Sequence, residues 1–336
     1  MNCPGCLKEN VETYCDKCRK ILFNGKKVSH ILTFSRPEFN EAKMERSGKL
    51  SISGIQVKHS LKLEGNALVL TEKDGEYILK PIPSGQFSHL DAVPANEHVT
   101  MQIASQVFEL STAENALIFF SDMQPAYITK RFDILLDGRK MLQEDFAQIG
   151  QMTEETAGKN YKYDYSYEQI AELMKKYIGA YSVEIEKYFR LVLFNFLVCN
   201  GDAHIKNFSI YRNEEYKDYL LTPFYDLINT AIHVPGERDT ALELFKDDFM
   251  TEGYKFSTNY SRDDFFEFGK RIGIKFTRID KLIDEITSNE KEITELLNKS
   301  FLSENLKSEY LKLTKERRER LLYSYSADKG KKEKRS

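Results

Sequence analysis

The first half of the chain carries short apolar runs separated by turn residues, a pattern typical of a sheet of short antiparallel strands. Gly65 and Asn66 stand between two such runs, and Asp74 and Gly75 stand before a third. Further on, the apolar positions change to helical spacing over residues 95–109. We predict strands at residues 50–53, 60–63, 67–70, 77–80, 117–120 and 126–132. The first half is therefore expected to be mostly sheet with one helix.

The second half of the chain has the periodicity of helices. Ser166 and Gln169 form the pattern of a capping box before an apolar stripe, and residues 185–198 are apolar on nearly every face, as in a buried helix. Further helices are expected after Ser261 and after Thr277, each of which is followed three residues later by an aspartate. The fold class that follows is α+β, with a β-rich first part and a helical second part.

Four of the five cysteines lie within the first 18 residues, as two C-x2-C pairs. Cys3 and Cys6 are separated from Cys15 and Cys18 by eight residues, so that four thiolates can close one tetrahedral Zn²⁺ site. The pattern resembles short zinc ribbons, whose metal supplies the folding energy that so short a segment lacks. A redox dithiol or a flexible tail remains the alternative. Cys199 stands alone in an apolar stretch and is expected to be a small core residue.

The composition excludes several classes of protein. With 336 residues, 41% hydrophobic and 12% aromatic, the chain is neither disordered nor a small disulfide-stabilised peptide. The formal net charge is -3, from 49 Lys and Arg against 52 Asp and Glu, so no direct contact with nucleic acid is expected. The apolar run at 191–199 is far shorter than the roughly 20 residues of a membrane span, and the start lacks a signal-peptide pattern. No membrane association and a cytoplasmic location are expected.

A set of oxygen donors follows the buried helix predicted at 185–198. Asp202 and Asn207 are separated by four residues, and Asp226 follows nineteen residues after Asn207. Phosphoryl transfer needs a carboxylate that orients a hydroxyl nucleophile and two oxygen ligands for Mg²⁺. We therefore predict Asp202 as the catalytic base, with Asn207 and Asp226 as magnesium ligands. A polar turn that merely caps the helix is the alternative for Asp202 and Asn207 taken alone.

The order of elements favours a kinase with two lobes. Lys80 ends a predicted strand of the β-rich part, where a kinase carries the lysine that contacts the phosphates, and the oxygen donors follow in the helical part. In place of a G-x-G-x-x-G loop, residues 51–56 contain only Gly54, and Asp226 stands in Y-D-L rather than D-F-G. An ordinary eukaryotic-type protein kinase is therefore disfavoured.

The motifs S-I-S-G-I-Q, I-L-K-P, N-E-H, K-R-F-D, G-D-A-H-I-K-N-F-S and T-P-F-Y-D-L occur in this order between Ser51 and Leu227. This series resembles the HipA-type serine/threonine kinases, which are toxins of bacterial toxin-antitoxin systems, and within them the short HipT form. The resemblance covers the chain from about Leu50 to the C-terminal helices. It implies a bilobal protein-kinase-like fold, ATP and Mg²⁺ as cofactors, and the transfer of phosphate to a serine of a protein.

Residue by residue, the resemblance implies the same roles for Asp202, Asn207, Asp226 and Lys80, and makes His204 an orienting group of the catalytic loop. It adds a hinge beside adenine, to which Lys130 contributes its backbone and Phe132 its ring. Glu97 could pair with Lys80 from the predicted helix, and a solvated glutamate on that helix is the alternative. The nucleotide loop would contact ATP through Ser51, Ser53, Gly54 and Gln56. In the family a serine of this loop is autophosphorylated, and Ser51 and Ser53 both fit, although small residues that simply approach phosphate are the alternative.

The resemblance also implies partners: an aminoacyl-tRNA synthetase as substrate and antitoxin proteins of HipB and HipS type. The longer HipA proteins have an additional N-terminal subdomain, whereas this chain has the cysteine motif at that end. We expect a zinc-ribbon-like motif at 1–24, an N-lobe at 25–135, a helical C-lobe at 136–326 and a basic flexible tail at 327–336. A small-molecule or lipid kinase, or a catalytically silent binding protein, is the alternative function.

Overall fold

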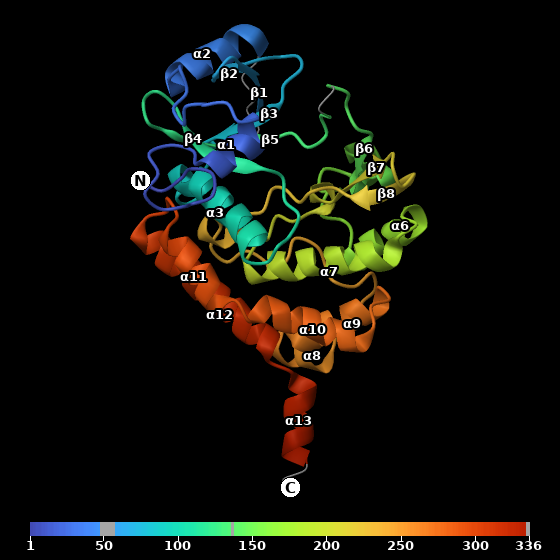
Figure 1. Cartoon of the computed structure of the whole chain (residues 1–336). Helices are drawn as coiled ribbons and strands as arrows, with labels where there is room; N and C mark the ends of the chain where they lie inside the picture. The colour runs from blue at the N-terminus through green and yellow to red at the C-terminus, as the bar shows by residue number, and fades with distance from the viewer. Residues whose placement is uncertain (48–57, 136–137, 334–336) are drawn as a thin grey trace.

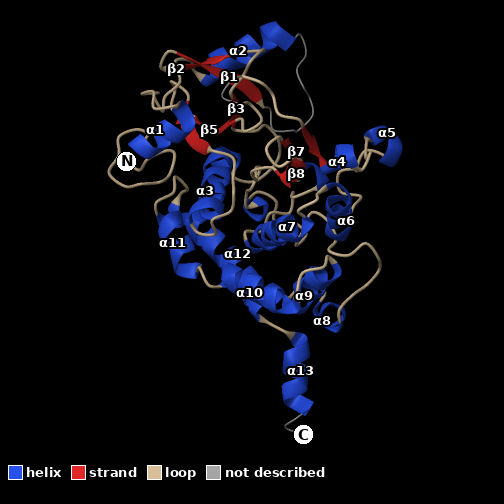
Figure 2. Ribbon diagram, turned by 45° about the vertical axis from the view of Figure 1, so that its right-hand side comes forward, coloured by secondary structure: helices blue, strands red, loops and turns tan. Residues whose placement is uncertain are grey.

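A computed structural model describes residues 1–47, 58–135 and 138–333, and it has two parts (Figure 1). A five-stranded sheet with its covering helices forms the upper part in this view, and a helical body with a small three-stranded sheet forms the rest. In the second view the strands lie above α7, and helices α8, α9, α10 and α13 lie below it (Figure 2). The chain thus has the β-rich first part and helical second part that the sequence pattern predicts.

The larger sheet is entirely antiparallel, with the strand order β2-β1-β3-β5-β4. Its strands are β1 (His59–Glu64), β2 (Ala67–Leu70), β3 (Tyr77–Pro81), β4 (Asn115–Phe119) and β5 (Pro125–Lys130). The helices of this part are α1 (Asp16–Phe23), α2 (Arg36–Ser47) and α3 (Val93–Gln106), with a short 3-10 turn, η1 (Leu90–Ala92), before α3. Helix α3 packs against β4 and β5, and a proline lies in its first turn, where the missing N–H costs no hydrogen bond.

The N-terminal segment shares a hydrophobic core with this sheet. Tyr14, Leu22 and Phe23 are buried in one cluster with sheet residues such as Tyr77 and Ile118. The Tyr14 hydroxyl donates to the backbone oxygen of Leu117 at 2.7 Å, and the Tyr77 hydroxyl donates to that of Leu22 at 2.7 Å. The cysteine-containing segment is therefore built into the β-rich part.

The second part surrounds the buried helix α7 (Tyr181–Leu197), whose apolar residues lie in the larger core cluster. The small sheet has the order β6-β7-β8, formed by β6 (Gln143–Asp145), β7 (Ser209–Asn213) and β8 (Asp218–Leu221). The remaining helices are α4 (Phe146–Ile149), α5 (Glu154–Ala157), α6 (Tyr167–Tyr177), α8 (Glu252–Ser257), α9 (Arg262–Arg271), α10 (Phe276–Thr287), α11 (Glu290–Asn298), α12 (Glu304–Leu322) and α13 (Tyr325–Glu333), with 3-10 turns η2 (Ile205–Asn207) and η3 (Thr230–Ile232).

Several element boundaries differ from the prediction for local reasons. The capping boxes at Ser166 and Ser261 are confirmed, whereas α10 begins before Thr277, so the expected cap at Thr277 is wrong. Helix α3 ends three residues early, and Glu109 has a left-handed backbone conformation that no helix continues through. The predicted strand at 50–53 lies outside the described residues.

Within the described ranges, no helix combines the length and the apolar character that crossing a membrane requires.

Candidate active site

Lys80 lies at the centre of a set of charges between the two parts. It stands in β3, which pairs with β1 on one side and with β5 on the other, and its side chain is buried. Its ammonium group contacts the carboxylates of Glu97, on α3, and of Asp226, which follows β8. The ion pair of Lys80 with Glu97 that the resemblance implies is therefore present. Lys58 contacts the second oxygen of Asp226 at 3.1 Å.

These contacts shift the pKa values of the three groups, of which Lys80 and Glu97 are buried and Asp226 is partly exposed. Burial alone would lower the pKa of Lys80, but the carboxylates of Asp226 and Glu97 outweigh it and raise that pKa. Burial would raise the pKa of Asp226, but Lys80 and Lys58 hold it below its ordinary value. For Glu97 burial prevails over the attraction of Lys80, so its pKa is raised. The opposite charges thus favour the ionised forms of Lys80 and Asp226, whereas the burial of Glu97 works against its charge.

The segment after α7 is held in shape by the side chain of Asn200. Its amide nitrogen donates to Asn195 Oδ1 at 2.9 Å and to the backbone oxygen of Asp226 at 3.4 Å. Its amide oxygen accepts from the backbone N–H of Asp202 at 3.3 Å. One buried asparagine therefore joins the end of α7, the predicted base and the predicted metal-binding aspartate.

Asn207 and Asp226 lie side by side, as a shared metal ion requires. Asn207 Nδ2 donates to Asp226 Oδ2 at 3.4 Å, and Asn207 Oδ1 accepts from the backbone N–H of His204 at 3.0 Å. Asp226 has a left-handed backbone conformation with φ 57°, uncommon for a residue with a side chain. In this arrangement the amide nitrogen of Asn207 faces Asp226, and its amide oxygen is bonded to His204. A side-chain amide and a carboxylate both carry the hard oxygen donors that Mg²⁺ prefers. The types of residue present therefore fit this ion, which Asn207 would bind by turning its amide oxygen toward it.

Asp202 has a partner that the sequence did not indicate. The exposed carboxylate accepts a hydrogen bond from the hydroxyl of Tyr163, whose ring lies edge-on to that of His204 with 5.4 Å between the ring centres. Burial lowers the pKa of His204, although the charge of Asp202 opposes this shift. A neutral imidazole at neutral pH suits the orienting role expected for His204.

The predicted hinge residues lie at the end of β5 and just beyond it. The ring of Phe132 stacks on that of Tyr225, the residue before Asp226, with 6.0 Å between the ring centres. The side chain of Lys130 turns to the N-terminal segment, where Nζ donates to the backbone oxygen of Ile21 and to Asn24 Oδ1, each at 3.1 Å. The predicted strand at 126–132 ends at Lys130 in the structure, so Arg131 and Phe132 lie just beyond it.

The residues predicted to form the nucleotide loop, Ser51, Ser53, Gly54 and Gln56, lie outside the described residues.

The four N-terminal cysteines converge. Their sulfur atoms all lie within 4.8 Å of one another, with 3.6 Å between those of Cys6 and Cys15. None of the four forms a disulfide. Four thiols gathered around one point have the geometry of a tetrahedral four-thiolate metal site, and soft sulfur ligands suit Zn²⁺. The chemistry of this donor set thus agrees with the ion predicted from the spacing.

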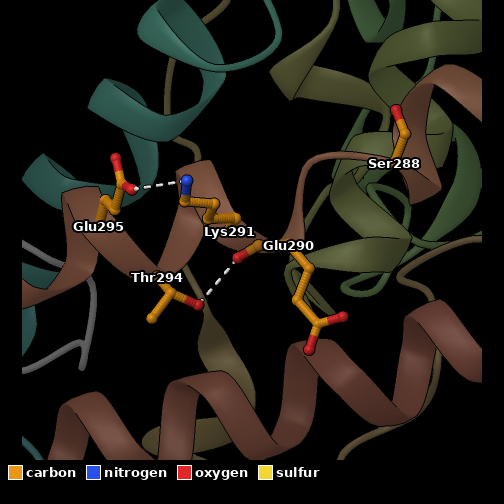
Figure 3. Close-up of a pocket in the computed structure, with 5 residues that line it drawn as sticks. All are labelled: Ser288, Glu290, Lys291, Thr294 and Glu295. Atoms are coloured by element: carbon orange, nitrogen blue, oxygen red, sulfur yellow. Dashed lines mark hydrogen bonds and ion pairs between the residues drawn. The ribbon is translucent and has the colours of Figure 1, made fainter.

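A surface pocket lies elsewhere, at the start of α11 (Figure 3). Ser288, Glu290, Lys291, Thr294 and Glu295 line it. Its polar groups largely satisfy one another, because Lys291 pairs with Glu295 at 3.8 Å and Thr294 donates to the backbone oxygen of Glu290 at 2.8 Å. None of the residues of the candidate active site takes part in it.

Sequence reasoning missed Tyr163, Asn200 and Lys58. Asn200 directly precedes the Gly-Asp pair of the catalytic motif, so its place in the sequence was a usable signal. Tyr163 lies 39 positions before Asp202 in a polar stretch, and nothing in that stretch indicates the contact. Lys58 follows the predicted nucleotide loop, and its contact with Asp226 depends on the folding of both parts.

The fold resembles those of two solved kinase structures. HipA in the toxin-antitoxin complex of HipA, HipB and operator DNA from Shewanella oneidensis superposes with a TM-score of 0.65 and 21% identity, covering 85% of this chain and 71% of that chain. The proinflammatory kinase CtkA of Helicobacter pylori gives a TM-score of 0.50 at 17% identity, covering 78% and 93% of the two chains. At these identities the likeness shows the fold.

Relatives by sequence carry the name "Putative kinase". One from Haemophilus influenzae is 29% identical over 321 residues, with 88% of this chain and 89% of the relative covered. Two from Sinorhizobium fredii are 28% and 27% identical and cover 58% and 60% of this chain. This chain spans about half the length of these two proteins. A family model described as the HipA-like C-terminal domain matches residues 50–293, and the chain therefore belongs to the HipA-like kinase family.

Proposed function

We propose that this protein is a serine/threonine protein kinase that transfers the γ-phosphoryl group of ATP to a serine hydroxyl. The contacts of Asp226 are the observation that carries the proposal. This carboxylate contacts the buried ammonium group of Lys80, which also pairs with Glu97, and it lies beside the amide of Asn207. Kinase chemistry needs such a lysine-glutamate pair beside two magnesium ligands. A catalytically silent protein has no need to hold two buried charges and a partly buried one together.

In this proposal each residue has one task. Asp202 accepts or orients the hydroxyl proton of the nucleophile, and the hydrogen bond from Tyr163 fixes one of its oxygens. Lys80 contacts the phosphates, and Asn207 with Asp226 would hold magnesium. When bound, Mg²⁺ neutralises charge that develops on the phosphates. His204 donates its backbone N–H to Asn207 and so keeps that amide in place.

The adenine site and the nucleotide loop complete the proposed ATP site. Phe132 would pack on the base, and its stacking on Tyr225 joins that surface to the magnesium-binding segment. Lys130 contributes through its backbone, since its side chain contacts the N-terminal segment. Ser51, Ser53, Gly54 and Gln56 would lie near the phosphates. Phosphorylation of Ser51 or Ser53 would place a dianion beside the triphosphate and switch the kinase off.

The biological role proposed is that of a toxin in a toxin-antitoxin system, acting in the cytoplasm. The likeness to HipA, solved together with HipB and operator DNA, supports antitoxin partners of HipB or HipS type. Because the charge of the chain is nearly balanced, we propose that the antitoxin, and not this chain, contacts DNA. An aminoacyl-tRNA synthetase is the proposed substrate on the basis of the family resemblance. Zn²⁺ on Cys3, Cys6, Cys15 and Cys18 is the proposed structural metal.

Incubation of the purified protein with labelled ATP and Mg²⁺ tests this function. The wild type should label itself, and the Ser51→Ala/Ser53→Ala double variant should not while it still turns over ATP. Asp202→Asn should reduce phosphoryl transfer by about 10²- to 10⁴-fold because it removes the base. Lys206→Gln, at an exposed position of the same turn, is a matched control for charge changes there.

No labelled protein and no ATP turnover in the wild type would overturn the kinase assignment. Labelling of a small molecule in a cell extract, with no labelled protein, would favour the small-molecule alternative. Growth arrest on expression that requires Asp202 and is relieved by a HipB- or HipS-like protein would support the role of a toxin, and normal growth would contradict it.

A further inference from the structure

The first cysteine turn, residues 3–6, is hydrogen-bonded directly to the elements that carry the active site. The backbone oxygen of Pro4 accepts from the N–H of Leu117 on β4 at 2.8 Å. The oxygen of Gly5 interacts with His98 Nε2 at 2.8 Å, and the oxygen of Cys6 accepts from Gln106 Nε2 at 3.0 Å. Three successive carbonyl groups of the turn are thus used to hold β4 and α3.

Two of these contacts fall on helix α3 at widely separated positions. His98 and Gln106 are eight residues apart, which is about 12 Å along a helix. The N-terminal segment lies beside this helix, as Figure 1 shows. Two contacts so far apart fix the rotation of the helix about its axis as well as its position. The cysteine turn therefore acts as a brace along one face of α3.

His98 is buried and makes one hydrogen bond through Nε2. Because the oxygen of Gly5 has only lone pairs to offer, Nε2 carries the proton and donates it. Within the described part of the chain, Nδ1 of this ring has no hydrogen-bond partner. Among the described residues, the bond to Gly5 is thus the hydrogen bond that the His98 side chain makes.

Three consecutive residues of α3 reach three different parts of the molecule. Asn96 donates to the backbone oxygen of Asn229 at 2.8 Å, three residues after Asp226. Glu97 pairs with Lys80, and His98 contacts the cysteine turn. Because successive side chains on a helix point about 100° apart, one orientation of α3 satisfies all three contacts. A shift of the cysteine turn would therefore move His98 and, with it, the adjacent residue Glu97.

The shape of the turn depends on the cysteines. A Cβ atom added at Gly5 would lie 2.6 Å from Cys18 Sγ, so the first turn wraps closely around the sulfur atoms of the second. Four thiolates held within 4.8 Å of one another repel unless a cation lies among them. A bound metal ion would keep both turns closed. Without it the turn is held by backbone hydrogen bonds such as that from the N–H of Leu7 to the oxygen of Cys3 at 2.9 Å, so the carbonyl groups that face α3 are held less firmly.

We propose that the four-cysteine site, occupied by one thiolate-preferring divalent ion of the zinc type, is a positioning element for the kinase. The first turn holds α3 in the orientation in which Glu97 pairs with Lys80, so that loss of the metal weakens nucleotide binding. This inference rests on the proposed function for its effect on ATP, but the effect on α3 does not depend on it. A metal site that merely stabilises the fold would leave nucleotide affinity and α3 unchanged in a folded variant.

Substitution of His98 separates the brace from the metal site itself. His98→Leu removes the donor and keeps apolar volume, and His98→Gln keeps a donor at the position of Nε2. We expect His98→Leu to retain one zinc ion per chain by mass spectrometry. We expect it to bind a non-hydrolysable ATP analogue about tenfold more weakly, and its α3 amides to exchange hydrogen faster. His98→Gln should restore both properties.

Variants at the cysteines and at Gln106, the second residue of α3 that contacts the turn, test the proposal further. Cys3→Ser/Cys15→Ser should lose the zinc ion and show the same changes in larger measure, whereas Cys199→Ser, at the cysteine outside the cluster, should keep the ion. Gln106→Met, at the other end of the brace, should produce smaller changes in the same direction. It serves as the readout where His98→Leu does not fold.

The possible outcomes separate the brace from the kinase assignment. Wild-type nucleotide affinity and wild-type exchange of α3 in both His98→Leu and Gln106→Met would overturn the brace and leave the kinase assignment standing. No nucleotide binding in the wild type, together with faster α3 exchange in the variants, would overturn the kinase assignment and leave the brace standing. Equal zinc content in the wild type and the double cysteine variant would overturn the metal site.

Discussion

At the scale of single residues, the buried charges around Lys80 show most clearly what the site depends on. Glu97 and Asp226 approach the same ammonium group from different parts of the fold. Glu97 is buried and Asp226 is partly buried, and the ammonium group of Lys80 favours the ionised form of both carboxylates. Removing the cation would leave two carboxylates in the interior with Lys58 as the remaining partner of Asp226.

We expect Lys80→Met to destabilise the protein by about 3–5 kcal/mol at pH 7.5, and by less at pH 5. In the wild type, the lowered pKa of Asp226 stabilises the folded protein at pH values above 3.8, the ordinary pKa of an aspartate. This stabilisation is lost as the pH falls through the lowered pKa of the folded state. The raised pKa of Lys80 stabilises the folded protein at pH values below 10.5, and this stabilisation is lost only in strong alkali. In the variant, burial acts on Glu97 without the opposing charge of Lys80, so Glu97 takes up a proton as pH falls and relieves the penalty.

Denaturant unfolding at the two pH values measures this difference. Lys80→Met/Glu97→Gln is the matched control, because it removes the carboxylate that would otherwise be left unpaired, and its stability should depend less on pH. If Lys80→Met lost the same free energy of unfolding at both pH values, the charges would contribute little to the stability of the protein.

The residues of the site were partly predictable from the sequence. Asp202, Asn207 and Asp226 were proposed from their spacing, and Lys80 from the order of the elements. The spacing brings Asp202 and Asn207 near each other because both lie in the short segment that follows the buried helix α7. Tyr163 was not predictable, since its contact with Asp202 depends on how a long polar loop folds over the site.

At the scale of elements, the predictions succeeded where periodicity was strong. Strands β1 to β5 and helices α6 and α7 follow clear patterns, and the capping box at Ser166 marks the start of α6. Strands β6 and β7 were missed, because β6 has only three residues and β7 follows the catalytic motif without a turn signal. The short helix α1 was missed since it lies between cysteines that indicate a metal site.

The contact between α9 and α10 gives a prediction on helix packing. A Cβ atom at Gly269 would lie 2.9 to 3.1 Å from three side-chain atoms of Ile279, which is fully buried. Gly269→Ala is therefore expected to cost about 1–3 kcal/mol, because the gain in helix propensity is smaller than the cost of overpacking. Lys281→Ala, at an exposed position of α10, should change stability by less than about 0.5 kcal/mol.

Thermal unfolding of these two variants beside the wild type measures both effects. A Gly269→Ala variant as stable as the wild type would mean that Ile279 can move aside.

At the scale of the whole molecule, α3 and the N-terminal segment connect the two parts. Asn96 bonds to Asn229, and the hydroxyl of Thr100 lies 3.0 Å from that of Tyr310 on α12. The charge set of Lys80 spans the same boundary. The sequence predicted the two parts but not their connection, because contacts between residues far apart in the chain leave no local pattern.

A ligand bound between the two parts should stabilise both together. An ATP analogue with Mg²⁺ at 100 times its Kd is expected to raise the free energy of unfolding by about 2.7 kcal/mol, provided that it binds only the folded state. Calorimetry should show one cooperative transition moving upward. Lys80→Met should show little shift at the same concentration, and a shift equal to that of the wild type would place the nucleotide elsewhere.

The first residues of the chain also contact a distant segment. Asn2 donates to the backbone oxygen of Lys299 at 2.7 Å across 297 positions, and Glu9 pairs with the side chain of Lys299 at 3.3 Å. The cysteine turns lie within one short segment and need only local contacts to close, whereas the contact with Lys299 joins residues 297 positions apart. Because distant contacts cost more loop-closure entropy than local ones, we expect the cysteine turns to close before the contact with Lys299 forms during refolding. On this expectation, the segment that carries the proposed metal site takes its shape before the two parts of the fold come together.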